Sequence, residues 1–203
     1  MRLAALAVVL ASTTAYADGF YYSQSYGVSS ARSDGASMLG ESIQLRIAMG
    51  WRIGAFTVGP LLTGHLAGER DNAYFHGLVG GDPTEGDSDL ESYGVDGRYH
   101  ARLGDNLVMY VRGGPRYANG IGALDGYRGF GVGAGTGVQL TGRVRALGFL
   151  FAPLFFMNKG PLITASVFLD ESVDYYKLSA SSMPALSMPM IGTSIGIAAG
   201  SHF

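Results

Sequence analysis

The sequence contains no cysteine and little charge. Without cysteine, the 203-residue chain can form neither disulfide bonds nor thiolate metal sites. Charged residues make up 15% of the chain, lysine occurs twice, and the formal net charge is −2, so there is no basic surface of the kind that binds nucleic acid. The 47% hydrophobic content excludes a disordered chain, and the 32 glycines follow no three-residue repeat, which excludes collagen.

The sequence also has no apolar run long enough for a membrane-spanning helix. The longest is Ala146–Met157, interrupted by Pro153, whereas such a helix needs about 20 residues. An integral membrane protein built from helices is therefore not expected.

The first 17 residues have the pattern of a secretory signal peptide. Arg2 supplies the positive charge, Leu3–Ala11 the apolar stretch, and Ala15-Tyr16-Ala17 the small-x-small cleavage pattern. The expected organisation is a signal peptide over residues 1–17, followed by one exported domain over residues 18–203.

Much of the remaining chain alternates with a period of two, as strands with two different faces do. In the segment 42–54, arginines, glutamine and small residues occupy one face and large apolar residues the other. The apolar face consists of Ile43, Leu45, Ile47, Met49, Trp51 and Ile53. Both a soluble β-sandwich and a membrane β-barrel show such alternation.

The segment 129–140 alternates in a different way. One face is apolar from Phe130 to Leu140, and the other is almost pure glycine from Gly129 to Gly137. A strand without side chains on one face leaves room for bulky groups from other strands. We therefore expect arginine and tyrosine side chains to pack against residues 129–137.

Paired arginines decide which face meets lipid. They lie opposite the apolar faces, and placing them on the lipid side would cost about 2–4 kcal/mol each near the bilayer midplane. A soluble sandwich would expose its polar face to water, where lysine is at least as common as arginine, yet this chain uses arginine almost exclusively. The residues expected to line a lumen are Arg46, Arg52, Arg98, His100, Arg102, Arg112 and Arg116.

The signal peptide, alternating strands, tight turns, long polar loops and terminal Phe203 together resemble the small outer-membrane β-barrel proteins of Gram-negative bacteria, the OmpA/OmpX-like barrels. The resemblance implies an all-β antiparallel transmembrane barrel in the outer membrane. It also implies that Phe203 is the signal read by the barrel assembly machinery. Ser201 stands where this family often has a larger apolar or aromatic residue.

Loop lengths predict ten strands. Eight is the alternative, because residues 162–178 could form one long strand and Ala146–Met157 is apolar on both faces. Short turns are expected in the periplasm near Gly54, Gly104-Asp105-Asn106 and Gly142, and loops outside at 29–40, 68–92, 117–127 and 180–189. The ten expected strands are 20–29, 41–53, 55–67, 93–104, 107–117, 128–141, 143–156, 161–170, 172–179 and 190–203.

The loop 68–92 is strongly acidic, with seven carboxylates and Arg70 as its only cation. Clustered carboxylates are ligands that calcium prefers, although the spacing here matches no EF-hand. A solvated acidic loop explains the same pattern. The metal-site residues on the first interpretation are Asp82, Glu85, Asp87, Asp89 and Glu91.

The lumenal arginines allow two interpretations. They could line a narrow anion-selective pathway, or they could pair with Asp96, Asp170 and Asp174, since buried charges must be paired. A third possibility is hydrolysis by a lumenal dyad, because a symmetric hairpin would set His65 roughly opposite Asp96. A structural histidine–aspartate pair explains that placement equally.

These patterns predict a non-enzymatic outer-membrane barrel with a narrow or plugged polar interior and a structural or surface-interaction role. A narrow anion-preferring channel is the first alternative, and an outer-membrane hydrolase is the second. No cofactor is expected. The expected partners are outer-membrane lipid, lipopolysaccharide and, during insertion, the barrel assembly machinery, with the protein itself a monomer.

Overall fold

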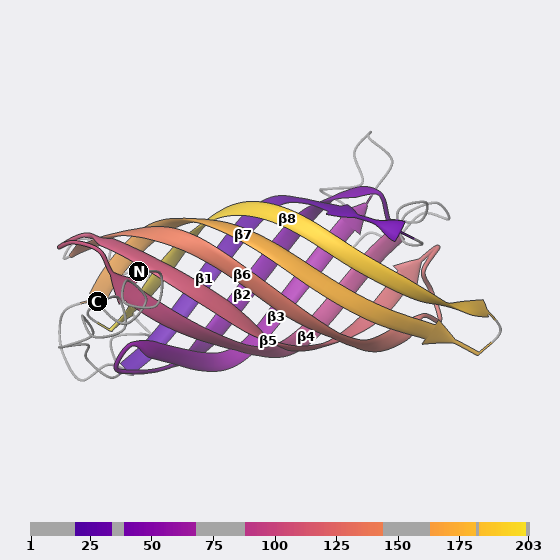
Figure 1. Cartoon of the computed structure of the whole chain (residues 1–203), viewed down its shortest axis with the longest axis horizontal. Helices are drawn as coiled ribbons and strands as arrows, with labels where there is room; N and C mark the ends of the chain where they lie inside the picture. The colour runs from indigo at the N-terminus through magenta and orange to yellow at the C-terminus, as the bar shows by residue number, and fades with distance from the viewer. Residues whose placement is uncertain (1–18, 34–38, 68–87, 144–162, 182, 202–203) are drawn as a thin grey trace, which may run out of the picture.

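The computed structural model describes residues 19–33, 39–67, 88–143, 163–181 and 183–201, which form a closed antiparallel β-barrel (Figure 1). The strands pair in chain order, and β1 closes the barrel against β8. They are β1 (Gly19–Ala31), β2 (Glu41–Ile53), β3 (Phe56–Ala67), β4 (Ser88–Arg102), β5 (Leu107–Gly122), β6 (Arg128–Arg143), β7 (Ile163–Ala180) and β8 (Met183–Ser201). No helix among the described residues is long and apolar enough to cross a membrane.

The barrel has eight strands, so the expectation of ten is wrong and its eight-strand alternative is confirmed. The expected strands 161–170 and 172–179 are one strand, β7, which pairs continuously through Glu171 with β6 and β8. The physical reason is that β7 contains no glycine or proline that could start a turn. The expected strand 143–156 lies, beyond Arg143, outside the described residues.

We call the end where β1 begins and β8 ends the terminal end, and the opposite end the distal end. Tight connections join β2 to β3 and β4 to β5 at the terminal end, which confirms the turns expected near Gly54 and Gly104-Asp105-Asn106. The turn expected at Gly142 is wrong, because Gly142 pairs with Ala165 inside β6.

The distal connections are shorter than expected where strand alternation continues. Residues 88–92 belong to β4, residues 117–122 to β5, and β8 begins at Met183, so much of the expected loop 180–189 is strand. Leu186, Met188 and Met190 continue the inward-facing series of β8, and their burial keeps this segment in the sheet.

The outer surface of the barrel is apolar on every strand. Exposed large hydrophobic side chains include Val28, Phe56, Phe130 and Ile195, which are each at least 60% exposed. Soluble proteins rarely expose contiguous apolar patches beyond a few hundred Å². A closed barrel with this exterior excludes the soluble sandwich and fits a lipid environment.

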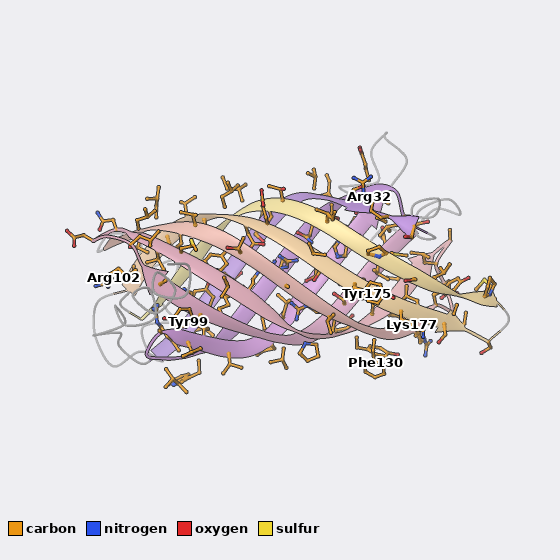
Figure 2. The ribbon with its side chains drawn as sticks, viewed as in Figure 1. Arg32, Tyr99, Arg102, Phe130, Tyr175 and Lys177 are labelled. Carbon is orange, nitrogen blue, oxygen red and sulfur yellow. The ribbon has the colours of Figure 1, made fainter. Side chains whose placement is uncertain are left out.

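Aromatic side chains mark both ends of this apolar surface (Figure 2). Tyr99 lies toward the terminal end and contacts Phe56, with ring centroids 5.0 Å apart. Phe130 and Tyr175 lie toward the distal end, where Phe130 packs edge-on against Tyr117 at 5.3 Å. Such rows are typical of the two interfaces of a membrane barrel.

The glycine face of β6 provides the space that the lumenal side chains fill, as the sequence predicts. A Cβ at Gly131 would lie 2.6 Å from Tyr176 Cδ1, and one at Gly135 would lie 3.0 Å from Arg112 Cζ. At Gly133 a Cβ would overlap Asp174 Oδ1 and lie 2.9 Å from Arg116 Nη2. The inner face of β6 is thus bare because the interior is filled from other strands.

We expect Gly133→Ala to lower the free energy of unfolding by about 1–3 kcal/mol, because the added methyl group overpacks the charged interior. Denaturant titration of the protein refolded in lipid vesicles measures this change. Gly64→Ala is the control, because a Cβ there meets nothing within 4 Å. Equal stabilities of the two variants would show that the space beside Gly133 is not filled.

Candidate functional site

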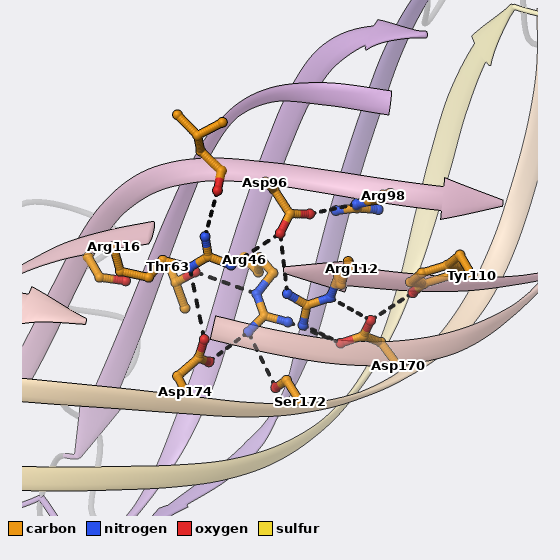
Figure 3. Close-up of polar contacts among 12 residues, drawn as sticks. Arg46, Thr63, Asp96, Arg98, Tyr110, Arg112, Arg116, Asp170, Ser172 and Asp174 are labelled. Carbon is orange, nitrogen blue, oxygen red and sulfur yellow. Dashed lines mark hydrogen bonds and ion pairs between the residues drawn. The ribbon is translucent and has the colours of Figure 1, made fainter. Parts of the chain in front are cut away.

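The middle of the lumen contains a network of buried charges (Figure 3). Its arginines come from β2, β4 and β5, and its aspartates from β4 and β7. No side chain in the network is more than 4% exposed. We call this set the central network; it consists of Arg46, Arg98, Arg112, Arg116, Asp96, Asp170 and Asp174.

Asp170 is bound by three side chains. Arg112 donates to both of its oxygens, from Nε to Oδ2 at 2.9 Å and from Nη2 to Oδ1 at 2.6 Å. Arg46 Nη1 donates to Oδ1 at 3.0 Å, and the Tyr110 hydroxyl donates to Oδ2 at 2.8 Å. Bidentate guanidinium–carboxylate pairs are among the strongest and most directional contacts in proteins. Asp170 therefore fixes β2 and β5 against β7.

Three arginines surround the carboxylate of Asp96 on the other side of the lumen. Arg98 Nε donates to its Oδ2 at 2.7 Å, and Arg116 Nη2 donates to its Oδ1 at 3.1 Å. Arg112 Nη1 lies 3.7 Å from the same Oδ1. Arg112 thus links the two carboxylates Asp96 and Asp170.

Asp174 completes the central network. Arg46 Nη2 donates to its Oδ2 at 3.1 Å, and Arg116 Nε lies 3.9 Å from its Oδ1. Arg116 also donates from Nη1 to the carbonyl of Val95 at 2.8 Å. The contacts connect all seven side chains and cross the lumen.

The central network carries an excess of one positive charge, because four guanidinium groups meet three carboxylates. Such groups are stable away from water only when they are paired and hydrogen-bonded. Each carboxylate lies within 4.0 Å of at least two arginines and accepts a hydrogen bond from at least one of them. The arrangement can hold the strands together, and its excess positive charge can attract an anion. Its arginines, however, are already paired with its aspartates.

The terminal side of the central network is aromatic. Tyr21, Tyr110 and Phe168 are buried there together, and the Arg98 guanidinium lies 5.0 Å from the ring centre of Tyr21. His100 contacts the Thr57 hydroxyl through Nε2 at 3.1 Å. This layer covers the charges on the side that faces the chain termini.

The remaining residues expected in the lumen lie at its terminal end. Arg52 is buried and donates from Nε to the carbonyl of Gly54 at 3.0 Å. Arg102 is the last residue of β4 and is only half-buried. The structure thus buries every expected lumenal residue except Arg102, and it brings Arg46, Arg98, Arg112 and Arg116 into one network.

The distal side of the lumen is apolar, in contrast to the polar interior expected from the sequence. Leu90, Leu178 and Met188 are completely buried there. We call this group the distal cluster; it consists of Ala31, Leu39, Leu90, Ala118, Leu124, Tyr127, Tyr176, Leu178, Leu186, Met188 and Met190. The alternation of β7 could have revealed this cluster from the sequence, because Leu178 lies on the same inward face of the strand as Asp170 and Asp174.

The expected proximity of His65 and Asp96 is wrong. His65 pairs with Leu90 in the β3–β4 hairpin, whereas Asp96 pairs with Gly59. The two positions are therefore about 20 Å apart along the strands at about 3.3 Å per residue. The hairpin is not symmetric about the expected loop, because β4 extends back to Ser88.

His65 has a different partner, the hydroxyl of Ser29. Its Nδ1 lies 2.9 Å from Ser29 Oγ, which in turn lies 2.8 Å from Ser42 Oγ. His65 is completely buried, and its ring meets Tyr176 edge-on at 6.3 Å. This histidine packs between the central network and the distal cluster.

Most residues of the expected metal site, and the expected assembly signal, cannot be placed. Asp82, Glu85, Asp87 and Phe203 lie outside the described residues. Glu91 accepts a hydrogen bond from the Tyr93 hydroxyl at 2.6 Å on the exterior of β4, and Asp89 precedes it on the same face. The described residues contain no group of three side chains that could hold a metal ion.

By sequence, no protein-family model and no curated protein matches the chain. By structure, it is similar to the Neisserial surface protein A, with a TM-score of 0.56 and 16% identity over 90% of this chain and 98% of that chain. It is also similar to Ail, the attachment invasion locus protein of Yersinia pestis, with a TM-score of 0.44 and 14% identity over 90% and 98% of the two chains. The N-terminal β-barrel domain of Pseudomonas aeruginosa OprF gives a TM-score of 0.38 and 12% identity over 89% and 97%.

The likeness to the Neisserial protein confirms the fold expected from the sequence. The chain has the architecture of a small Gram-negative outer-membrane β-barrel, closed by eight antiparallel strands. At this level of identity the likeness concerns the fold alone.

We expect Asp170→Ala to lower the free energy of unfolding by about 3–5 kcal/mol, because buried Arg112 loses its bidentate partner and buried Arg46 loses one of its two carboxylates. Urea titration in lipid vesicles measures the loss. Asp105→Ala, in the exposed turn between β4 and β5, removes the same chemical group and should change stability by less than about 0.5 kcal/mol. A loss at Asp170 no larger than at Asp105 would contradict the role assigned to the central network.

Proposed function

We propose that the protein is an integral outer-membrane barrel without catalytic activity, whose closed interior gives it a structural or surface-interaction role. The observation that carries this proposal is the central network, in which arginines and aspartates from four strands meet across the lumen. Side chains largely fill the interior of an eight-stranded barrel.

The order of layers along the lumen supports a closed interior. The aromatic layer of Tyr21, Tyr110 and Phe168 lies on the terminal side of the charges, and the distal cluster lies on the other side. An ion crossing the barrel would have to disturb both layers and break buried ion pairs between them. Open lumens of larger porins are lined by polar groups and water instead.

The environment of the described histidines supports a role without catalysis. His65 and His100 each contact a hydroxyl group, and both are buried inside the barrel. A general base has to come within hydrogen-bonding distance of a substrate. Neither ring is placed to meet a lipid or peptide at the surface.

The two ends of the barrel support a specific orientation in the membrane. We place the terminal end, with its tight turns, in the periplasm and the distal end outside, as is usual for such barrels. Lys177 pairs with Phe130 at the distal end, and Arg128 lies two residues before Phe130 on the same strand; both charged side chains are exposed. They are positioned to meet the phosphate groups of lipopolysaccharide, while assembly through Phe203 would use the barrel assembly machinery.

A narrow anion-preferring channel is the second candidate. It is favoured by one observation, the excess positive charge of the central network. Rings of arginine select anions in pores that conduct. On this alternative the guanidinium groups would exchange their carboxylate partners for the passing anion.

Bilayer conductance of the refolded protein separates the two candidates. We expect no steady single-channel openings, because the ion pairs block the lumen. The double variant Arg46→Ser/Arg112→Ser, which empties the middle of the network, should conduct measurably more than wild type and shows that the assay detects an opened lumen. Arg128→Ser is the matched exterior control and should stay silent. Steady anion-selective openings of the wild type would overturn the closed barrel in favour of the channel.

A further inference from the structure

One carboxylate, Glu171, faces outward from the middle of β7. Its neighbours on the same face of the strand are Leu169 and Val173, which are 55% and 52% exposed. The residues directly opposite it are Thr136 on β6 and Thr193 on β8, and both are exposed. We call these three residues the polar patch; it is surrounded by apolar side chains.

The polar patch lies deep within the apolar band. Glu171 is four residues from Tyr175, which belongs to the distal aromatic row, and this separation corresponds to about 13 Å along the strand. At a strand tilt of about 40° this is a depth of about 10 Å, and the apolar band of such barrels is about 25 Å tall. Glu171 is therefore near the middle of the bilayer, beyond the reach of lipid head groups.

No other outward-facing charge in the described strands is placed in this way. The others lie within three residues of a strand end, where they reach the interface; they are Glu41, Asp89, Glu91, Arg128 and Lys177. An ionisable group facing hydrocarbon is costly, and such groups commonly mark functional contacts. The carboxyl group of Glu171 therefore needs a hydrogen-bonding partner, which lipid tails do not supply.

The barrel provides hydrogen-bond partners for another outward-facing polar residue, Gln24, but not for Glu171. The amide of Gln24 accepts from the Tyr22 hydroxyl at 3.0 Å and donates to the Tyr26 hydroxyl. Glu171 has no hydrogen bond or ion pair with any described residue, and the hydroxyl of Thr136 donates to the carbonyl of Tyr110 at 3.0 Å. The carboxyl group of Glu171 is thus open toward the membrane.

We propose that the polar patch is the contact between two copies of this chain in the membrane. The inference rests on the proposed membrane insertion, and it replaces the monomer expected from the sequence. A two-fold axis along the membrane normal keeps depth unchanged, so Glu171 of one copy meets Glu171 and Thr193 of the other at the same level. The patch is self-complementary, because a protonated carboxyl group and a threonine hydroxyl each donate and accept hydrogen bonds.

The surface beside the polar patch permits close approach of a second barrel. The adjacent cross-strand row contains Gly97, Gly113 and Ala134, which pair in this order and carry no side chain larger than a methyl group. Small residues at a membrane interface let two backbones come close enough for polar contacts to form. The row extends from β4 to β6 and ends at β7 on Val173, the residue next to Glu171 on the same face of the strand.

Single-cysteine cross-linking tests the contact, since the natural chain has no cysteine that would interfere. Val173→Cys places a thiol beside Glu171, and Leu62→Cys places one on β3, across the barrel from β7. Membranes containing either variant are treated with a short bis-maleimide, and products are separated by mass. We expect a product of twice the chain mass from Val173→Cys, in at least fivefold higher yield than from Leu62→Cys.

Substitution of Glu171 in the Val173→Cys background tests its part in the contact. We expect Glu171→Leu to lower the yield at least threefold, whereas Glu171→Gln, which still donates and accepts hydrogen bonds, retains most of it. Equal yields from positions 173 and 62, or a yield unchanged by Glu171→Leu, would overturn the proposal. A cross-linked product of any other mass would show that the partner is a different protein, and would overturn the proposal that it is a second copy of this chain. Recovery of the protein outside the membrane fraction would instead contradict the proposed function.

Discussion

The pairing of buried arginines with buried aspartates is the constraint on which the rest of the structure depends. Arg46 and Asp170 are 124 residues apart in the chain, yet their side chains meet at 3.0 Å inside the barrel. A slip of one residue in any contributing strand would turn its charges toward lipid. The central network therefore specifies the register of four strands as well as filling the lumen, and the glycine face of β6 follows from the space that it needs.

The need to keep charges inside the lumen and away from lipid also explains the two different faces of the barrel's strands. Apolar side chains face outward on every strand, while charges and hydroxyl groups face inward near the middle of the lumen. The aromatic layer and the distal cluster then isolate these charges from both ends. A barrel built in this way presents its surfaces, rather than its interior, to the cell envelope. Among the described residues, Glu171 is the one charged side chain in the middle of the outer surface.

Alternation in the sequence predicted which side chains face inward and which face outward. It did not predict where strands begin and end or how they are registered, because these depend on pairing between strands. Parity of the arginines was sufficient to assign the inner face, and the bare face at residues 129–137 followed from the alternation of glycine with larger residues. One of the two extra strands was expected because Glu171 interrupts the apolar face of β7 without a turn. The misplaced His65–Asp96 pair had a related cause, since hairpin register depends on where β4 begins. Parity alone could have revealed the distal cluster but not its packing.

A double-mutant cycle between Arg112 and Asp170 tests the central claim most directly. It compares the unfolding free energies of wild type, Arg112→Ala, Asp170→Ala and the double variant in lipid vesicles. A bidentate pair at 2.6 and 2.9 Å that holds β5 to β7 predicts a coupling free energy of about 1–3 kcal/mol. Single effects that add within about 0.5 kcal/mol would show that the two groups do not depend on each other, and would contradict the account.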